Sequence, residues 1–326
     1  YGLDRDFRKG RTDTATFAIE HDLTDSLTIK NTLRHGTSMQ DYILTQPDDS
    51  NRFQFNFHST LPQVSSIAVS ELVEALANRQ LSVVYQPKVC CKTYALRGFE
   101  ALARWHHPEY GFISPDVFIH LAEKNGLIDS LTIAVLDIAL PWFAAFCQQH
   151  RAQYPMLSLS LNISALSLNN LSLFDQLEQR CLELQLAPSA IMLELTETAA
   201  MGDPITSLDI LTRLRMKGFK VSIDDFGTGY SSMLQLVRLP FSELKVDKTF
   251  VMTANTVPES KLVIKAIIEL AQSLGLQVTA EGIEDVAALM FLQSLGCDLA
   301  QGYFFARPLA ANHLDDWLSR HQARQF

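Results

Sequence analysis

The most informative stretch of this chain is Asp224-Asp225-Phe226-Gly227-Thr228-Gly229-Tyr230-Ser231-Ser232. It follows the apolar run Phe219 to Ile223, so two adjacent carboxylates stand where a strand ends and a glycine-rich turn begins. Gly227 and Gly229 give this turn a backbone freedom that other residues lack. Carboxylates repel a bare phosphate, but they bind divalent cations, which in turn bind phosphate. The pair therefore indicates a metal-dependent phosphate site, or alternatively a solvated pair that caps the next helix.

A pattern of helix, glycine, strand and polar residue recurs along the chain. Leu262 to Leu274 is an amphipathic helix that Gly275 caps, and the strand Leu276 to Ala280 ends at Glu281. Further strands, each with the polar residue that follows it, are Leu157–Leu161 with Asn162, Ile191–Leu193 with Glu194, and Cys297–Ala300 with Gln301. Short apolar strands that alternate with helices are typical of a parallel sheet. The chain length favours an α/β fold with a closed (β/α)8 barrel of the TIM type, which carries its chemistry at the carboxyl ends of its strands.

The polar residues expected at those strand ends form one set. The set is Glu100, Asn162, Glu194, Asp224, Asp225, Lys245, Glu281 and Gln301. It contains oxygen ligands and neither histidine nor cysteine, which favours Mg²⁺ or Mn²⁺ over zinc. One aspartate that bridges two such cations is an arrangement that cleaves phosphodiesters by in-line displacement. A nearby lysine can orient the attacking water or neutralise charge in the transition state.

Residues 1–64 differ from the rest and are predicted to form a separate β-rich or irregular extension, with the main domain in residues 65–326. Apolar and polar residues alternate over Phe17 to Leu33, and Thr24-Asp25-Ser26 is placed as a hairpin turn. This extension resembles a fragment of a TonB-dependent siderophore receptor, notably over Phe17–Leu33 and Tyr42–Asp49. It has too few strands to close a barrel. The alternative is a small antiparallel sheet docked on the main domain.

Composition excludes several classes of protein. A formal net charge of −9 argues against a nucleic-acid polymer as partner, because phosphate backbones need clustered Lys and Arg. Five cysteines without a Cys-x-x-Cys spacing favour reduced thiols in the cytoplasm. Acidic and basic residues follow Tyr1 in place of the apolar core of a signal peptide, so we expect no signal peptide there. The most apolar stretch, Leu131 to Cys147, contains Asp137 and Pro141 and is short for a bilayer, so we expect a buried helix and no membrane span.

The spaced motifs of the chain resemble those of a known family. Glu100-Ala101-Leu102 is the signature of the EAL domain family, the cyclic di-GMP phosphodiesterases. The motifs that carry the resemblance are Tyr85-Gln86-Pro87, Ala103-Arg104-Trp105, Leu161-Asn162-Ile163-Ser164, Glu194-Leu195-Thr196-Glu197, Asp224 to Ser232, Leu244-Lys245-Val246-Asp247, Ala280-Glu281-Gly282-Ile283-Glu284 and Gln301-Gly302-Tyr303. They extend from about Val69 to Leu318, and none of the positions departs from the family pattern.

The resemblance implies a role for each residue of the site. The metal ligands would be Glu100, Asn162, Glu194 and Asp224 for a first cation, and Asp224, Asp225 and Glu281 for a second. The catalytic residues would be Lys245, Glu281, Asp225 and Glu197, the last of which would anchor the loop Phe226–Ser232. The substrate-binding residues would be Gln86, Arg104, Asp247, Gln301 and Pro308. Glu281 would be either a general base or a ligand of the second cation, and both roles stay open.

The resemblance also implies an activity. The chain would hydrolyse cyclic di-GMP to linear pGpG with two cations of Mg²⁺ or Mn²⁺, and Ca²⁺ would inhibit it. A homodimer would form through the helix Glu259–Leu274 and the loop Phe226–Ser232. The alternative is a catalytically silent receptor for cyclic di-GMP, against which the intact ligand set argues.

Overall fold

The computed structural model describes residues 16–24, 27–34, 67–201, 204–227 and 233–323. The chain divides into two compact units, Tyr1–Ala68 and Val69–Phe326. The boundary predicted between residues 64 and 65 lies outside the described residues, so the position of this boundary stays a prediction.

The first unit contains an antiparallel hairpin. Strand β1 (Thr16–Thr24) pairs with β2 (Leu27–Arg34), and Phe17 lies opposite Leu33. Thr24 pairs with Leu27, which confirms that the chain reverses at the predicted turn. The stretch Tyr42–Asp49, which carries part of the resemblance to a receptor fragment, lies outside the described residues.

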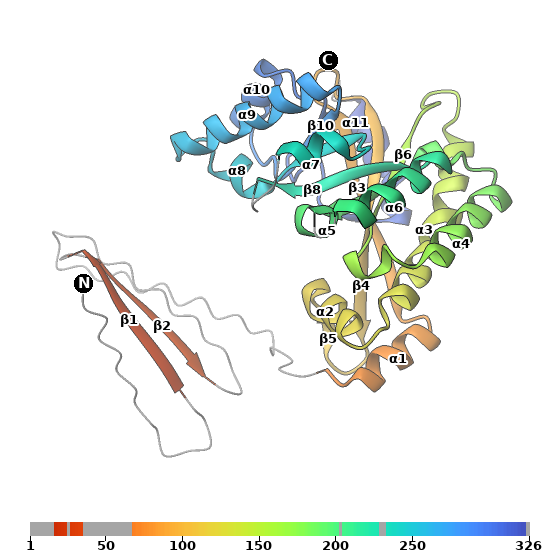
Figure 1. Ribbon diagram of the computed structural model, residues 1–326, viewed down its shortest axis with the longest axis horizontal. Helices are drawn as coiled ribbons and strands as arrows, with labels where there is room; N and C mark the ends of the chain where they lie inside the picture. Colours follow the sequence, from red (N-terminus) through yellow and green to blue (C-terminus); the bar gives the residue numbers. More distant parts are fainter. Residues whose placement is uncertain (1–15, 25–26, 35–66, 202–203, 228–232, 324–326) are drawn as a thin grey trace. The chain divides into compact units, whose positions relative to one another are not determined.

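The second unit is a barrel, drawn with its surrounding helices in Figure 1. In the described part of the chain, eight strands form a closed sheet because β3 pairs both with β4 and with β11. The eight strands are β3 (Leu81–Cys90), β4 (Leu96–His107), β6 (Ser158–Asn162), β7 (Ile191–Thr196), β8 (Lys220–Phe226), β9 (Glu243–Val246), β10 (Gln277–Ala280) and β11 (Leu299–Ala300). Two short strands, β5 (Gly111–Ile113) and β12 (Leu309–Ala310), pair with β4 and β3. The predicted (β/α)8 barrel is confirmed.

Helices connect the strands and cover the outside of the barrel (Figure 1). They are α1 (Val69–Ala77), α2 (Pro115–Lys124), α3 (Ile128–Gln149), α4 (Leu171–Glu183), α5 (Glu197–Met201), α6 (Pro204–Met216), α7 (Met233–Arg238), α8 (Lys248–Thr253), α9 (Pro258–Leu274), α10 (Val286–Ser294) and α11 (Leu314–Ala323). Gly275 ends α9 with φ at 68°, the left-handed conformation expected of a glycine cap. The predicted alternation of helix, glycine and strand is confirmed here.

Strand β3 runs antiparallel to both of its neighbours, whereas a regular barrel of this type has parallel strands throughout. The reason is the connection to β4, which comprises only residues 91–95. A parallel neighbour would need a crossover of a dozen or more residues, while an antiparallel one needs only a short turn. As a result Gln86 of β3 lies directly opposite Glu100 of β4.

The apolar helix predicted over Leu131 to Cys147 is α3. By length and composition alone it is the one helix of the described residues that could cross a membrane. Its side chains Leu140 and Phe143 are fully buried, and the ring of Phe146 packs edge-on against Phe99 of β4. The predicted burial is therefore confirmed for the face of α3 that turns toward the barrel.

We predict that a chain beginning at Ser65 folds without the first 64 residues. The hydrophobic core of the second unit is built from buried residues between Val83 and Leu318, so the truncation removes none of its members. Thermal unfolding followed by circular dichroism should show one cooperative transition, at a midpoint close to that of the barrel in the full chain. Loss of the transition would mean that the first unit is part of the barrel core.

Candidate active site and metal centre

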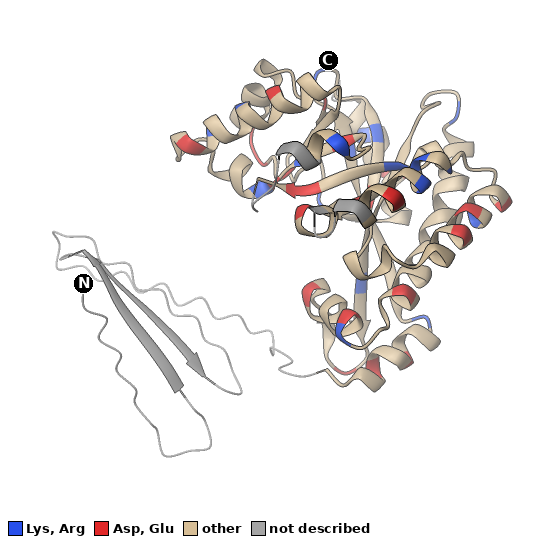
Figure 2. Ribbon diagram, viewed as in Figure 1, with Lys and Arg blue, Asp and Glu red and all other residues tan. Residues whose placement is uncertain are grey.

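Polar side chains from seven strands meet at one end of the barrel. Parallel strands end at the same edge of a sheet, so the residues in or just after their last positions come together. Asn162 of β6 is level with Glu194 of β7, and Asp224 of β8 is level with Thr196 of β7. In Figure 2, β8 carries a basic residue near its start and acidic residues at its end. The predicted gathering of polar residues is what the structure shows.

Lys245 lies at the centre of the cluster and is completely buried. Its Nζ is 2.6 Å from Glu281 Oε1, 2.8 Å from Glu194 Oε2 and 3.1 Å from Asp224 Oδ1. Glu100 Oε2 is farther away, at 3.9 Å. An ammonium group has three N–H donors, which matches the three short contacts. Lys245 therefore holds together carboxylates that come from four different parts of the chain.

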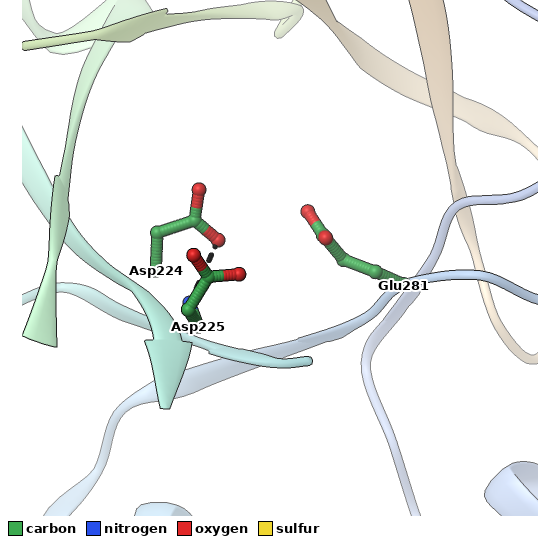
Figure 3. A group of neighbouring side chains, drawn as sticks. All are labelled: Asp224, Asp225 and Glu281. Atoms are coloured by element: carbon green, nitrogen blue, oxygen red, sulfur yellow. Dashed lines mark hydrogen bonds between the residues drawn. The ribbon is translucent and has the colours of Figure 1, made fainter. Parts of the chain in front are cut away.

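Asp224 and Asp225 both face the barrel mouth although they are neighbours in sequence. Consecutive residues of a regular strand point to opposite faces of the sheet. Here the backbone of Asp225 has φ at 55°, and the pairing of β8 with β9 shifts register between Ile223 and Phe226. Figure 3 shows the result, with the carboxylates of both aspartates and of Glu281 turned toward a common space. One carboxylate oxygen from each of these three residues lies within 4.8 Å of the corresponding oxygens of the other two.

Amide side chains hold Glu100 from both sides. Asn162 Nδ2 donates to Glu100 Oε1 at 2.8 Å, and Gln301 Nε2 donates to Glu100 Oε2 at 2.6 Å. Gln301 Nε2 also donates to Gln86 Oε1 at 3.1 Å, and Gln86 Nε2 donates to the carbonyl of Ala306. The Oε1 atom of Gln301 is buried and has no hydrogen-bond partner among the described residues. A buried acceptor of this kind is ready for a ligand or a water.

The carboxylates titrate differently because their surroundings differ. Burial opposes ionisation of Glu194, yet Lys245 and Lys88 lower its pKa to about 2. Burial raises the pKa of Glu281 to about 8, and the charges of Asp224 and Glu100 add to this increase against the effect of Lys245. Burial likewise raises the pKa of Glu100, Asp224 and Asp225. Raised pKa values on neighbouring acids indicate a site with too little positive charge.

The residues present fit divalent cations. The five carboxylates that gather here are Glu100, Glu194, Asp224, Asp225 and Glu281. Lys245 contacts all of them except Asp225. When all five are ionised, four negative charges remain uncompensated by Lys245, which is the charge of two divalent cations. The donors are oxygen atoms, the type that Mg²⁺ and Mn²⁺ prefer. The acidic cluster can therefore hold a metal ion.

Glu197 fixes the start of the loop after β8. It is 4% exposed, and its Oε2 accepts a hydrogen bond from Gly227 N at 2.9 Å. Gly227 has φ at 98°, and a Cβ atom there would approach Phe250 and Ile267 to 3.1 Å, so glycine is required. Residues 228–232 of the predicted loop lie outside the described residues.

Three residues predicted to bind substrate lie outside the set of carboxylates around Lys245. Arg104 donates to its own neighbour's carbonyl, Ala103 O, and lines a cavity rather than contacting the carboxylates. Asp247 caps α8 by accepting from Thr249 N at 2.9 Å, and it also shares a hydrogen bond with Asp225. Pro308 directly precedes β12. The substrate-binding roles of all three stay predictions.

A cavity of about 390 Å³ opens beside the acidic cluster. Its lining includes Asp224 and Asp225, the positively charged Arg104, and residues of α2 and α3. The volume falls in the range of ordinary ligand pockets. A bound molecule could therefore contact the carboxylates and the guanidinium of Arg104 together.

Sequence reasoning missed a second group of charged residues deeper in the barrel. Lys88 of β3 and Glu243 of β9 are 0% and 1% exposed, and their charged atoms are 3.5 Å apart. The signal for Lys88 was its spacing, because it follows Gln86 by two positions and so shares its face of β3. No comparable signal exists for Glu243, because it begins a strand of four residues, which is too short for periodicity to reveal.

Comparison with known proteins gives the relatives of this chain. In Pseudomonas aeruginosa, the bifunctional diguanylate cyclase/cyclic di-GMP phosphodiesterase MucR is 41% identical over 75% of this chain and 35% of its own length. The cyclic di-GMP phosphodiesterase RocR of the same organism is 37% identical over 77% of this chain and 63% of its own length. This chain thus spans about a third of the length of MucR and less than two thirds of the length of RocR.

Solved structures share the fold. A complex of the P. aeruginosa MucR phosphodiesterase with c-di-GMP has a TM-score of 0.71 and 41% identity, and the match covers 76% of this chain and 98% of that one. The EAL enzyme Bd1971 with cAMP and cyclic di-GMP bound has a TM-score of 0.72 and 33% identity, over 76% and 66% of the two chains. Residues 69–308 match the family model for the EAL domain, and this chain belongs to the EAL domain family.

Proposed function

We propose that this chain hydrolyses cyclic di-GMP to linear pGpG. The observation that carries the proposal is the buried Lys245 in contact with Glu100, Glu194, Asp224 and Glu281 at the mouth of the barrel. The names of the relatives, which include cyclic di-GMP phosphodiesterases, support the substrate and the reaction. In the reaction, the oxygen of water bonds to phosphorus, the bond to the ribose 3′ oxygen breaks, and that oxygen takes up a proton and leaves as a hydroxyl group.

Two cations of Mg²⁺ or Mn²⁺ complete the site in this proposal. When bound, they polarise the phosphate and lower the pKa of water. Glu100, Asn162, Glu194 and Asp224 would hold the first, and Asp224, Asp225 and Glu281 the second, as the proximity of the last three supports. The loose, longer coordination of Ca²⁺ does not suit this arrangement, so we expect it to inhibit.

The chain's own side chains accept the proton and stabilise the charge that develops. Lys245 exchanges one of its three short carboxylate contacts for the attacking water, to which it donates, and it offsets negative charge that develops at the phosphate. Glu281, whose Oε1 is 2.6 Å from Lys245 Nζ, would either serve as a ligand of the second cation or accept the proton of that water as a general base. The free acceptor Oε1 of Gln301 helps to seat the water. Arg104 pairs with a phosphate of the substrate across the cavity, which suits its forked donors.

The assembly and location of the protein are part of the same proposal. We expect a homodimer formed around α9, where Leu262 is 69% exposed, together with the loop that follows Gly227. The reduced cysteines fit the cytoplasm, where free cyclic di-GMP would reach the barrel mouth.

Turnover should depend on the cation. After chelation with EDTA, the protein should produce no pGpG; Mg²⁺ or Mn²⁺ should each restore production, and Ca²⁺ should suppress it in competition with Mg²⁺. Chromatography of the nucleotides after each single-metal addition measures this. Full activity in EDTA would exclude metal catalysis by this site.

Replacement of Glu197 by Gln should lower turnover without unfolding the protein. The bond to Gly227 N loses its ionic component, which roughly halves its strength. Because Gly227 follows the Asp224-Asp225 pair, we expect kcat to fall by about tenfold at limiting Mg²⁺. Glu183→Gln, an exposed glutamate of α4, is the matched control. Equal activity of Glu197→Gln and parent would refute the anchoring role.

Replacement of Asp225 by Asn separates an enzyme from a silent receptor. The change keeps the shape of the side chain and removes one charge from the second metal position. We expect kcat to fall by at least about 100-fold, while the affinity for cyclic di-GMP changes far less. Calorimetry in Ca²⁺ measures binding, and a pGpG assay in Mg²⁺ measures chemistry.

The control for that experiment is Asp209→Asn, which alters an exposed aspartate of α6 paired with Arg213. It should leave both quantities unchanged. If the parent itself binds cyclic di-GMP tightly and never forms pGpG, the chain is a receptor and the catalytic roles proposed above are wrong.

A further inference from the structure

Lys88 lies beneath the acidic cluster and faces the inside of the barrel. Along β3, the side chains of Tyr85 and Val89 pack outward in the hydrophobic core, so Gln86 and Lys88 point to the barrel interior. Gln86 joins the cluster through Gln301. Lys88 is one layer deeper, is fully buried and donates to Ser160 Oγ. A buried ammonium is costly unless it is paired.

Two lysines contact the carboxylate of Glu194, one at each oxygen. Lys88 Nζ is 3.3 Å from Glu194 Oε1, whereas Lys245 Nζ is 2.8 Å from Glu194 Oε2. One lysine approaches from β3 and the other from β9. A carboxylate held at both oxygens cannot rotate, so the lone pairs that remain keep a fixed direction. Glu194 is thus the only one of the five acids that the described structure places between two buried lysines.

Glu243 balances the charge of Lys88. Its Oε1 is 3.5 Å from Lys88 Nζ and accepts a hydrogen bond from Ser222 Oγ at 3.1 Å. Without Glu243, Glu194 would be the only carboxylate within ion-pair distance of Lys88 in the described residues, although Lys245 also contacts Glu194. The pair of Lys88 and Glu243 is neutral as a unit, so it orients Glu194 without changing the net charge available to cations above.

We propose that Lys88 and Glu243 form a positioning pair that orients Glu194 for the first cation. The inference rests on the proposed function for the assignment of Glu194 as a metal ligand. Neither residue touches the substrate or the reacting atoms, since both lie below the ligands. Groups behind a ligand typically change metal affinity or activity by about 10- to 100-fold when they are removed.

The test measures Mn²⁺ binding without substrate, by the electron paramagnetic resonance signal of the free ion. Two variants carry it, Lys88→Met and the double variant Lys88→Met/Glu243→Gln. Both remove the contact to Glu194, so both should bind Mn²⁺ at least about tenfold more weakly than the parent. In turnover, kcat at fixed Mn²⁺ should fall by a similar factor while KM for cyclic di-GMP stays within about twofold, because the substrate contacts are intact.

The double variant separates orientation from folding. Lys88→Met alone leaves Glu243 buried without its cation, which destabilises the fold, but the double variant carries no unpaired charge and should unfold near the temperature of the parent. Thr279→Val is the matched control, because Thr279 is a fully buried residue of β10 whose hydroxyl has no partner among the described residues. It should bind Mn²⁺ as the parent does.

Two outcomes decide between the proposals. A folded double variant with parental Mn²⁺ affinity would overturn the positioning role, whatever the reaction of the chain is. Weakened Mn²⁺ binding in the variants of a parent that forms no pGpG would support the positioning role and refute only the proposed hydrolysis.

Discussion

One buried ammonium group, that of Lys245, allows acids from four parts of the chain to share the mouth of the barrel. Each carboxylate taken out of water loses solvation, and each repels the others, so the cluster is costly without a cation inside it. Lys245 makes three contacts between 2.6 and 3.1 Å, and when all five acids are ionised it leaves four negative charges uncompensated. This surplus is the property of the structure from which a metal site follows.

The barrel can bear such a charged interior because its apolar core lies elsewhere. Strand residues alternate between two faces, and the chain uses the outward face for packing and the inward face for chemistry. Phe99 and Leu244 are fully buried between strands and helices, while the next residues, Glu100 and Lys245, point inside the barrel. Changes in the site and changes in the hydrophobic core are therefore largely independent of each other, since they involve opposite faces of the same strands.

Sequence predicted the parts of the site that follow from a general rule. Glu281 was predicted because a polar residue after a short apolar strand must lie at the barrel mouth. Three features were not predictable in this way. The antiparallel direction of β3 depends on the short connection 91–95, the shared direction of the aspartate pair depends on the left-handed backbone of Asp225, and the pairing of Lys88 with Glu243 joins strands far apart in sequence. Local patterns do not encode which distant charges will meet inside a closed sheet.

The central claim is that the surplus charge around Lys245 is the charge of two divalent cations. Crystals grown with Mn²⁺ and measured at the manganese absorption edge test it most directly. The account predicts two anomalous peaks, one in contact with Glu100, Asn162, Glu194 and Asp224 and one in contact with Asp224, Asp225 and Glu281. Strong anomalous data without a peak among these side chains would contradict it.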